Sequence, residues 1–244
     1  MLYSSSANEQ GETDRTGRFL MDSEPIKHAA DAVASVIRAR ATFKVMGDPA
    51  APVRFSSEVA ERNLQTVQDA LRIAGWAPFH HALDQDGIAE PWRAHVIGYE
   101  ASQRLAAKLP EWFTNLKPTN KLVPMMNACG ALVLVTWLPQ FGDPPTPNPK
   151  QRIVNEEHLA ATAAMVQNLL LLLTAHGMGT YWSSGGQLGD PKFLAEIGAS
   201  SGERLSAAVF IEYPETMSES KNRLPGKHRR SRSDRWIREV KSED

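Results

Sequence analysis

The sequence contains a single cysteine among its 244 residues, so no disulfide can form within the chain. Cys129 lies in the apolar segment NACGALVLV, a setting typical of a buried, unreactive thiol rather than a nucleophile. The absence of disulfides fits a reducing compartment. The first twenty residues also lack the apolar stretch of a secretory signal and contain acidic residues. Both absences favour a cytoplasmic location.

The chain has almost no net charge, with a formal value of −1 at pH 7. A near-neutral protein has no general attraction to nucleic acid or to an anionic membrane. Hydrophobic residues make up 42% of the chain and charged residues 23%, which is typical of globular domains. We therefore expect one domain over residues 23–244, preceded by a disordered polar tail at residues 1–22.

No apolar run reaches the length of about 20 residues that a membrane span needs. The longest, AATAAMVQNLLLLLTAH at 160–176, is apolar on nearly every side but interrupted by polar residues. A helix of this kind belongs in a large core when it does not lie in a membrane. Asn155 could cap its start, and Gly177 suits the left-handed position after its end. The sequence thus predicts a buried helix over 156–176, with Glu156 and Glu157 at its positive end.

Apolar periodicity predicts the remaining elements. Helices are expected from Ser23 to the segment 38–44, from Ser56 or Ser57 to Gly75, over 101–116 and near 191–197. Strands are expected over 93–98, 131–137 and 206–213. The proline-rich segment 138–150 is predicted to be a loop, and 177–186 a glycine-rich turn. Because strands and helices do not alternate regularly, the pattern indicates an α+β fold.

Most catalytic motifs are missing. The glycines of GMGTYW close a helix instead of opening one, which excludes a dinucleotide fingerprint. No Walker A pattern is present, and Ser183-Ser184-Gly185 lacks the Gly-x-Ser-x-Gly of a nucleophile elbow. His80 and His81 are adjacent, with no metal-ligand spacing around them, so the sequence favours a structural or substrate-side role over a metal site.

Two basic clusters stand out. Arg38 and Arg40 lie at the end of the first predicted helix, and the segment PGKHRRSRSDRW lies near the C-terminus. Each could be a solvated surface or compensate a helix dipole. Alternatively, both could converge on a dianionic phosphate, because arginine side chains bind phosphate in a bidentate fashion.

The order of these motifs resembles that of the FMN-dependent nitroreductase family. The resemblance covers about residues 25–240 and is carried by Arg38-Ala39-Arg40, Ala74-Gly75-Trp76-Ala77-Pro78, Pro91-Trp92-Arg93, the segment 177–185 and Arg229-Arg230. It departs from the family pattern at Arg40, Thr42 and Phe79, and in the long insert at 79–90. No single motif is specific, but the order and spacing of the set are.

The resemblance implies a nitroreductase-like α+β fold. Its central, mainly antiparallel sheet is flanked by helices, and a long buried helix lies at the interface of a homodimer. It also implies FMN bound at that interface by both chains. The cofactor-binding residues it implies are Arg38, Ala39, Arg40, Pro78, Phe79, His80, His81, Trp182, Ser183, Ser184, Gly185, Arg229, Arg230 and Arg232. The arginines would hold the phosphate, and the small residues would let backbone approach the ring.

The implied activity is hydride transfer from NADH or NADPH to a nitroaromatic, quinone or similar acceptor in a ping-pong cycle. The flavin carries this chemistry, so no catalytic side chain and no metal are expected. A flavin sensor or carrier of the same fold is a second hypothesis. A third is a nucleic-acid binder acting through the basic tail, which the neutral charge and the lack of a nucleic-acid module disfavour.

Overall fold

The computed structural model describes residues 23–83, 85, 87–114, 116–117, 120–142, 148–217, 223–225, 228 and 231–240. The chain divides into two compact units, residues 1–39 and residues 40–244. The first unit contains helix α1 (Ser23–Ala39), which begins where the sequence predicted a helix start. The expected tail at residues 1–22 lies outside the described residues. The expectation of one domain over 23–244 stays a prediction.

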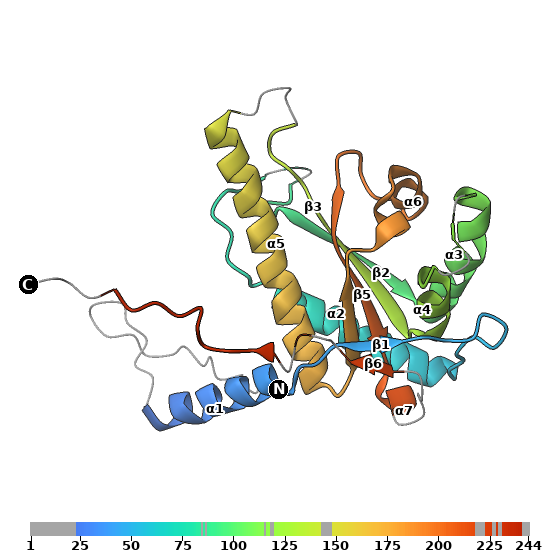
Figure 1. Cartoon of the computed structure of the whole chain (residues 1–244), viewed down its shortest axis with the longest axis horizontal. Helices are drawn as coiled ribbons and strands as arrows, with labels where there is room; N and C mark the ends of the chain where they lie inside the picture. Colours follow the sequence, from blue (N-terminus) through green and yellow to red (C-terminus); the bar gives the residue numbers. More distant parts are fainter. Residues whose placement is uncertain are drawn as a thin grey trace, which may run out of the picture. The chain divides into compact units, whose positions relative to one another are not determined.

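The second unit is built on a four-stranded antiparallel sheet (Figure 1). Its order is β2 (Trp92–Gly98), β3 (Ala131–Trp137), β5 (Arg204–Glu212) and β4 (Gly179–Ser183). The sequence predicted the first three strands. The prediction of a turn over 177–186 is wrong for β4, which pairs with β5 from Gly179 opposite Glu212 to Ser183 opposite Ala208. Its Thr-Tyr-Trp sequence has the residue types that strands prefer.

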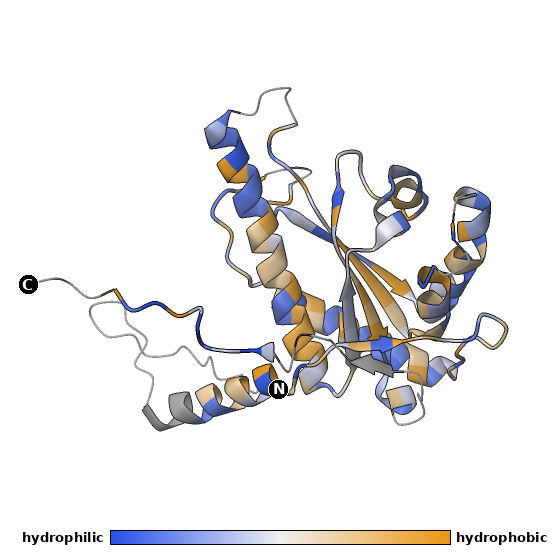
Figure 2. Ribbon diagram, in the orientation of Figure 1, coloured by the Kyte–Doolittle hydropathy of each residue, from blue (hydrophilic) through white to orange (hydrophobic). Residues whose placement is uncertain are grey.

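Both faces of the sheet are covered, which explains why β3 is apolar at nearly every position. Successive strand residues point to opposite faces. Val133 and Val135 enter one core with residues of α2 (Ser57–Ala74) and α5 (Pro149–Ala175). Leu132 and Leu134 enter a second core against other helices. Figure 2 shows the strands as the hydrophobic centre of this unit.

The second core is closed by shorter helices. These are α3 (Tyr99–Trp112), α4 (Leu122–Ala128), the 3₁₀ turn η1 (Gly186–Gly189) and α6 (Pro191–Glu196). The sequence placed α3 at 101–116, whereas it starts at Tyr99 and ends at Trp112. It did not predict α4 or the short α7 (Pro214–Met217).

Helix α5 begins seven residues earlier than the sequence indicated, and Asn155 is not its cap. Asn148 caps the helix, its side chain accepting a hydrogen bond from the Lys150 N–H at 2.9 Å. Asn155 instead bonds both backbone groups of Phe141, accepting at 3.1 Å and donating at 2.8 Å. The helix therefore takes over the end of the segment predicted as a loop. Gly177 has the expected positive φ, 73°.

Helix α5 is long and apolar enough to cross a membrane by length and composition. In this fold, however, one face packs into the core with residues His158, Ala161, Thr162, Met165, Val166, Leu169, Leu170 and Leu173. Two apolar side chains outside this face are exposed, Ile153 at 51% and Leu159 at 40%. The helix is thus buried on one side only within this chain.

A second, two-stranded sheet joins distant parts of the unit. Strand β1 (Phe43–Val45) pairs antiparallel with β6 (Arg223–Pro225), with Phe43 opposite Pro225. Thr42 forms a parallel bridge to Thr180 of β4, and the Lys44 ammonium lies 4.8 Å from the centre of the Tyr181 ring. The segment that follows Arg40 is thereby held between β4 and a C-terminal strand.

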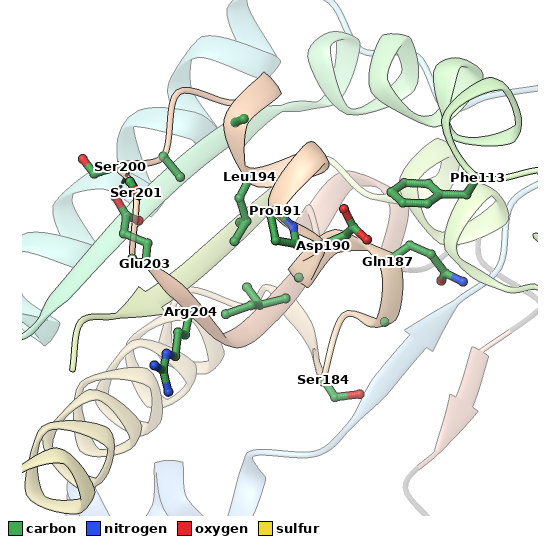
Figure 3. A pocket seen from close by; sticks show the side chains of 16 residues that line it. Phe113, Ser184, Gln187, Asp190, Pro191, Leu194, Ser200, Ser201, Glu203 and Arg204 are labelled. Atoms are coloured by element: carbon green, nitrogen blue, oxygen red, sulfur yellow. Dashed lines mark hydrogen bonds between the residues drawn. The ribbon is translucent and has the colours of Figure 1, made fainter. Parts of the chain in front are cut away.

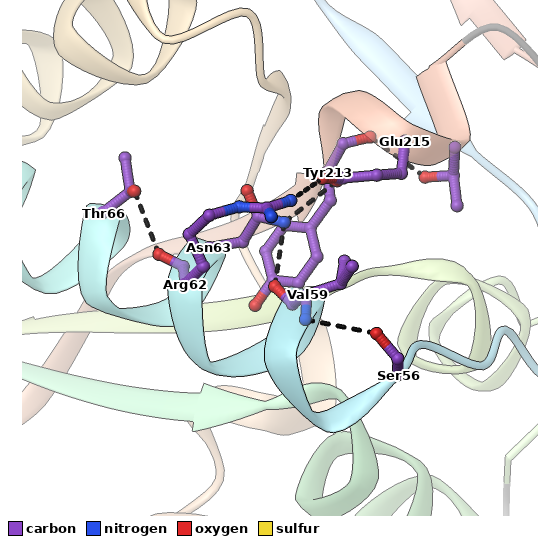
Figure 4. A network of polar contacts seen from close by, with 8 residues as sticks. Ser56, Val59, Arg62, Asn63, Thr66, Tyr213 and Glu215 are labelled. Carbon is purple, nitrogen blue, oxygen red and sulfur yellow. Dashed lines mark hydrogen bonds and ion pairs between the residues drawn. The ribbon is translucent and has the colours of Figure 1, made fainter.

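A polar network ties α2 to α7, the short helix that follows β5 (Figure 4). Buried Asn63 donates to the Val59 carbonyl at 3.0 Å and to Glu215 Oε2 at 2.9 Å. Arg62 forms an ion pair with the same carboxylate. Ser56 caps α2 by accepting from the Val59 N–H at 3.3 Å, as the sequence predicted for Ser56 or Ser57.

Candidate functional site

The turn from Pro78 to His81 follows α2 and is anchored at two points. Ala77 is buried ahead of it. The Phe79 ring packs edge-on against Trp92 of β2, with ring centres 5.6 Å apart. Phe79, where the sequence departs from the family pattern, therefore fixes the turn to the sheet. His80 and His81 extend from this fixed point toward α5.

His80 and His81 meet Glu157 of α5. The two imidazole rings stack with centres 4.6 Å apart and planes 7° from parallel. His81 Nε2 lies 2.9 Å from Glu157 Oε2, and His80 Nδ1 lies 3.9 Å from Glu157 Oε1. A hollow of about 580 Å³ adjoins them, lined by Pro78, Phe79, His80, Glu157, Ala160, Ala161 and Ala164.

A backbone hydrogen bond joins Leu83 and Ala89, two described residues of the insert after this turn. The Leu83 N–H donates to the Ala89 carbonyl at 2.9 Å. Arg93 of β2 donates to the carbonyls of Glu90 and Trp92, at 2.9 and 2.7 Å. These bonds hold the end of the insert at the start of β2.

The segment Trp182–Gly185 spans the end of β4 and a tight turn. Trp182 and Ser183 are strand residues, and Ser183 Oγ accepts a hydrogen bond from the Gly185 N–H at 3.1 Å. Gly185 and Gly186 both have positive φ, 82° and 54°. Glycine adopts this left-handed conformation without the steric penalty of other residues. At the buried Gly185 the missing side chain lets Leu205 pack closely against the turn, whereas Gly186 is exposed.

A larger hollow of about 1200 Å³ lies beyond this turn (Figure 3). Ser184 and Gly186 are at one side, with η1, α6 and the loop before β5 around it. Two carboxylates, Asp190 and Glu203, line it beside the cation Arg204. This acidic lining is a poor environment for a phosphate dianion. The hollow shares no lining residue with the one beside His80.

Glu203 is the most buried acid of this region, with its side chain 3% exposed. It accepts from the Ser200 N–H at 2.7 Å, from Thr136, and contacts His95 Nε2 at 2.6 Å. Burial alone would raise the pKa of the Glu203 carboxyl. The hydrogen bonds from Thr136, His95 and Ser200, together with the charge of His95, outweigh burial and lower the pKa. The cluster joins β2 and β3 to the loop before β5.

The structure does not test the predicted arginine cluster. Arg38 and Ala39 are the last residues of α1, in the first unit. Arg40 opens the second unit just before β1, and Arg232 is exposed in the C-terminal segment. Arg229 and Arg230 lie outside the described residues. The gathering of these arginines around a phosphate stays a prediction.

Two polar clusters escaped the sequence analysis. Glu157 was predicted only as a first-turn residue facing the helix dipole, and no local pattern links it to His80 and His81. His95 and Glu203 are 108 residues apart, so their contact has no signal in the sequence either. Both clusters depend on how helices and loops dock on the sheet.

The sequence of this chain is similar to those of known nitroreductases. A sequence profile described as the nitroreductase family matches residues 63–211. A protein of Bacillus subtilis (strain 168), named "Putative NAD(P)H nitroreductase YfhC", is 28% identical over 163 residues, covering 65% of this chain and 78% of that protein.

Solved structures agree on the fold. Nitroreductase CinD from Lactococcus lactis in complex with chloramphenicol aligns with a TM-score of 0.52 and 15% identity. The same protein in complex with nicotinic acid gives 0.51 and 16%. Both alignments cover 75% of this chain and 89% of the other. The expected nitroreductase-like α+β fold is confirmed.

Proposed function

Because the chain belongs to the nitroreductase family, a family of oxidoreductases, we propose that it is an FMN-dependent enzyme. It transfers hydride from NADH or NADPH to a nitroaromatic, quinone or related small organic acceptor in a ping-pong cycle. FMN, when bound, supplies the hydride chemistry. The protein's own residues bind and orient the cofactor and the acceptor.

The pairing of β1 with β6 is the observation that carries this proposal. In an antiparallel pair, the chain before Phe43 and the chain after Pro225 leave the ladder at the same end. The first contains Arg40, and the second continues into the basic segment with Arg229, Arg230 and Arg232. The paired register ends there, since Arg40 lies in no strand and His228 lies in a 3₁₀ turn, but both segments depart from the same end of the ladder. Cations from both ends of the polypeptide would then meet at one place, as a phosphate dianion requires.

The turn after β4 supports the second part of the cofactor site. Ser184 and Gly186 are exposed on this turn, whereas Gly185 between them is buried against Leu205. Backbone N–H groups and small side chains of this kind suit close approach to a flat ring. We assign Trp182, Ser183, Ser184 and Gly185 to the ring side of FMN.

A homodimer completes the site in this proposal. The turn carrying Pro78, Phe79, His80 and His81 borders one hollow, whereas the turn after β4 borders another. Two chains packed through the exposed apolar side of α5 would let the Pro78–His81 turn of one chain face the other chain's cofactor. The exposed Ile153 and Leu159 favour such a contact.

The decisive experiment is the visible absorption spectrum of purified protein before and after anaerobic addition of NADPH. We expect a bound flavin spectrum that bleaches rapidly in stopped-flow mixing and returns when a nitroaromatic or quinone is added. A colourless protein that retains no FMN after incubation and gel filtration would refute the proposal. Retained FMN that does not bleach with either NADPH or NADH would instead indicate a flavin sensor or carrier.

Replacement of Arg40 tests the phosphate site separately. Loss of a hydrogen bond to a charged group costs about 1.5–3 kcal/mol, so Arg40→Ala should raise the FMN dissociation constant about 10- to 100-fold. Arg104→Ala, at an exposed arginine on α3, is the matched control and should leave FMN affinity unchanged. Flavin fluorescence during titration measures both. Equal affinity in the Arg40 variant and the wild type would exclude Arg40 from the cofactor site.

A further inference from the structure

We propose that His80, His81 and Glu157 form a binding site for a transition-metal dication of the Zn²⁺ type. One coordination position would be open toward the hollow beside α5. His side chains and carboxylates are the usual nitrogen and oxygen ligands of zinc. The ligand atoms of the three residues all lie within 4.8 Å of one another.

The spacing of these atoms is close to what a shared ion requires. Ligand atoms bound about 2.0–2.1 Å from a tetrahedral zinc ion lie about 3.3 Å apart. The two nitrogen-to-oxygen distances, 2.9 Å for His81 and 3.9 Å for His80, fall on either side of that value. Because His80 is 78% exposed, its ring can turn away from its stack on His81. In the stacked arrangement the in-plane lone pairs of the two rings do not converge, so binding one ion requires the His80 ring to leave the stack.

The Glu157 carboxylate gives a second indication that a ligand is missing from this site. Glu157 Oε2 is buried, yet no described residue donates a hydrogen bond to it. His81 Nε2 is near enough at 2.9 Å, but its direction does not suit a hydrogen bond. Ligand atoms around one ion behave in this way, because their lone pairs point at the ion and not at each other. A buried oxygen without a partner is costly, and a cation would remove that cost.

The site is held in place before any ion binds. Phe79 fixes the turn to Trp92, as described above. The side chain of Asn168 on α5 donates to the Ala74 carbonyl at the end of α2, at 3.4 Å. The turn and the helix that supply the ligands are thus joined through the same neighbouring elements. Such support lowers the ordering cost of metal binding.

The ligand set favours zinc and its neighbours over magnesium. Imidazole suits Zn, Cu, Fe and Ni, whereas Mg²⁺ prefers an all-oxygen shell. Three protein ligands and an open fourth position are typical of zinc sites that accept a further molecule. The small side chains of Ala160 and Ala164 leave room for that molecule. The inference rests on the three ligand residues of this chain, and in the proposed homodimer the bound ion would lie beside the other chain's cofactor.

The test is isothermal titration of the purified, chelator-treated full chain with Zn²⁺. We expect one ion per chain, and no binding of Mg²⁺ at the same concentrations. Glu157→Gln keeps the shape of the side chain but removes its charge, and should weaken Zn²⁺ binding at least tenfold. His80→Ala, at an exposed position that tolerates change, should do the same. Zn²⁺ should also raise the melting temperature of the wild type more than that of either variant.

Two matched variants separate this site from adventitious binding. Glu156→Gln changes the adjacent carboxylate of α5, which pairs with Arg152 instead. His176→Ala removes an exposed histidine at the end of the same helix. Both should bind Zn²⁺ as the wild type does. The proposal fails if the wild type binds no stoichiometric Zn²⁺, or if Glu157→Gln and His80→Ala bind it with unchanged affinity.

Discussion

At the scale of single residues, Glu203 links the charge state of the protein to its stability. Its folded-state pKa is lowered, because hydrogen bonds and His95 favour the carboxylate more than burial opposes it. The unfolded value is about 4.3. The stabilisation from Glu203 is therefore complete above about pH 5 and is lost as the pH falls through the lower folded value.

Replacing Glu203 by glutamine should lower the free energy of unfolding in a pH-dependent way. The variant keeps the shape but loses the charged acceptor for His95, Thr136 and the Ser200 N–H. We expect a loss of about 1.5–3 kcal/mol in the free energy of unfolding at pH 7, the range for hydrogen bonds to charged groups. Urea unfolding at pH 7 and pH 3 measures it. The difference from wild type should shrink at pH 3, whereas exposed Glu111→Gln should show little effect at either pH.

Cys129 is the second residue whose environment decides its chemistry. Cys129 is 2% exposed, and burial raises the pKa of its thiol to about 11 despite the hydrogen bond with Ser102. Only the thiolate reacts readily with alkylating agents. We expect no labelling by iodoacetamide in the native protein at pH 8 and complete labelling in urea. Rapid labelling of the folded protein would contradict the inert role that the sequence predicted.

At the scale of elements, two asparagines near the start of α5 have different roles. Asn148 caps the helix, and Asn155 holds the loop at Phe141. Asn148→Ala should lower the free energy of unfolding by about 1 kcal/mol and speed hydrogen exchange at the Lys150 amide. Asn155→Ala should speed exchange at the Phe141 amide instead. Faster exchange at the Glu157 or His158 amide in Asn155→Ala, with no change in Asn148→Ala, would instead support Asn155 as the cap, as the sequence alone indicated.

At the scale of the whole molecule, the unpartnered side of α5 is the feature that a single chain leaves unexplained. Leu159 is exposed there, and a glutamate in its place would be buried without a partner in a dimer packed through α5. We expect Leu159→Glu to sediment as a monomer in analytical ultracentrifugation and to lose FMN. Ala107→Glu, on the exposed surface of α3, is the control and should stay dimeric. A wild-type monomer, or a dimeric Leu159→Glu variant, would rule out this interface.

The sequence by itself determined the elements that local pattern specifies. The runs at 131–137 and 206–213 predicted β3 and β5 because apolar residues on both strand faces require a sheet covered on both sides. The order of motifs predicted the family and its fold. The predicted loop over 138–150 was wrong at its end, where α5 begins at Pro149. Proline suits the first turn of a helix as well as a loop.

The tertiary structure alone decided which distant residues meet. Strand β4 exists because it pairs with β5, although glycines flank its sequence. Glu157 reaches His80 and His81, and Glu203 reaches His95, only because helices and loops dock on one sheet. Local periodicity records which face of an element is buried, but it carries no information about which other element covers that face. The candidate metal site and the buried acid are therefore properties of the folded chain.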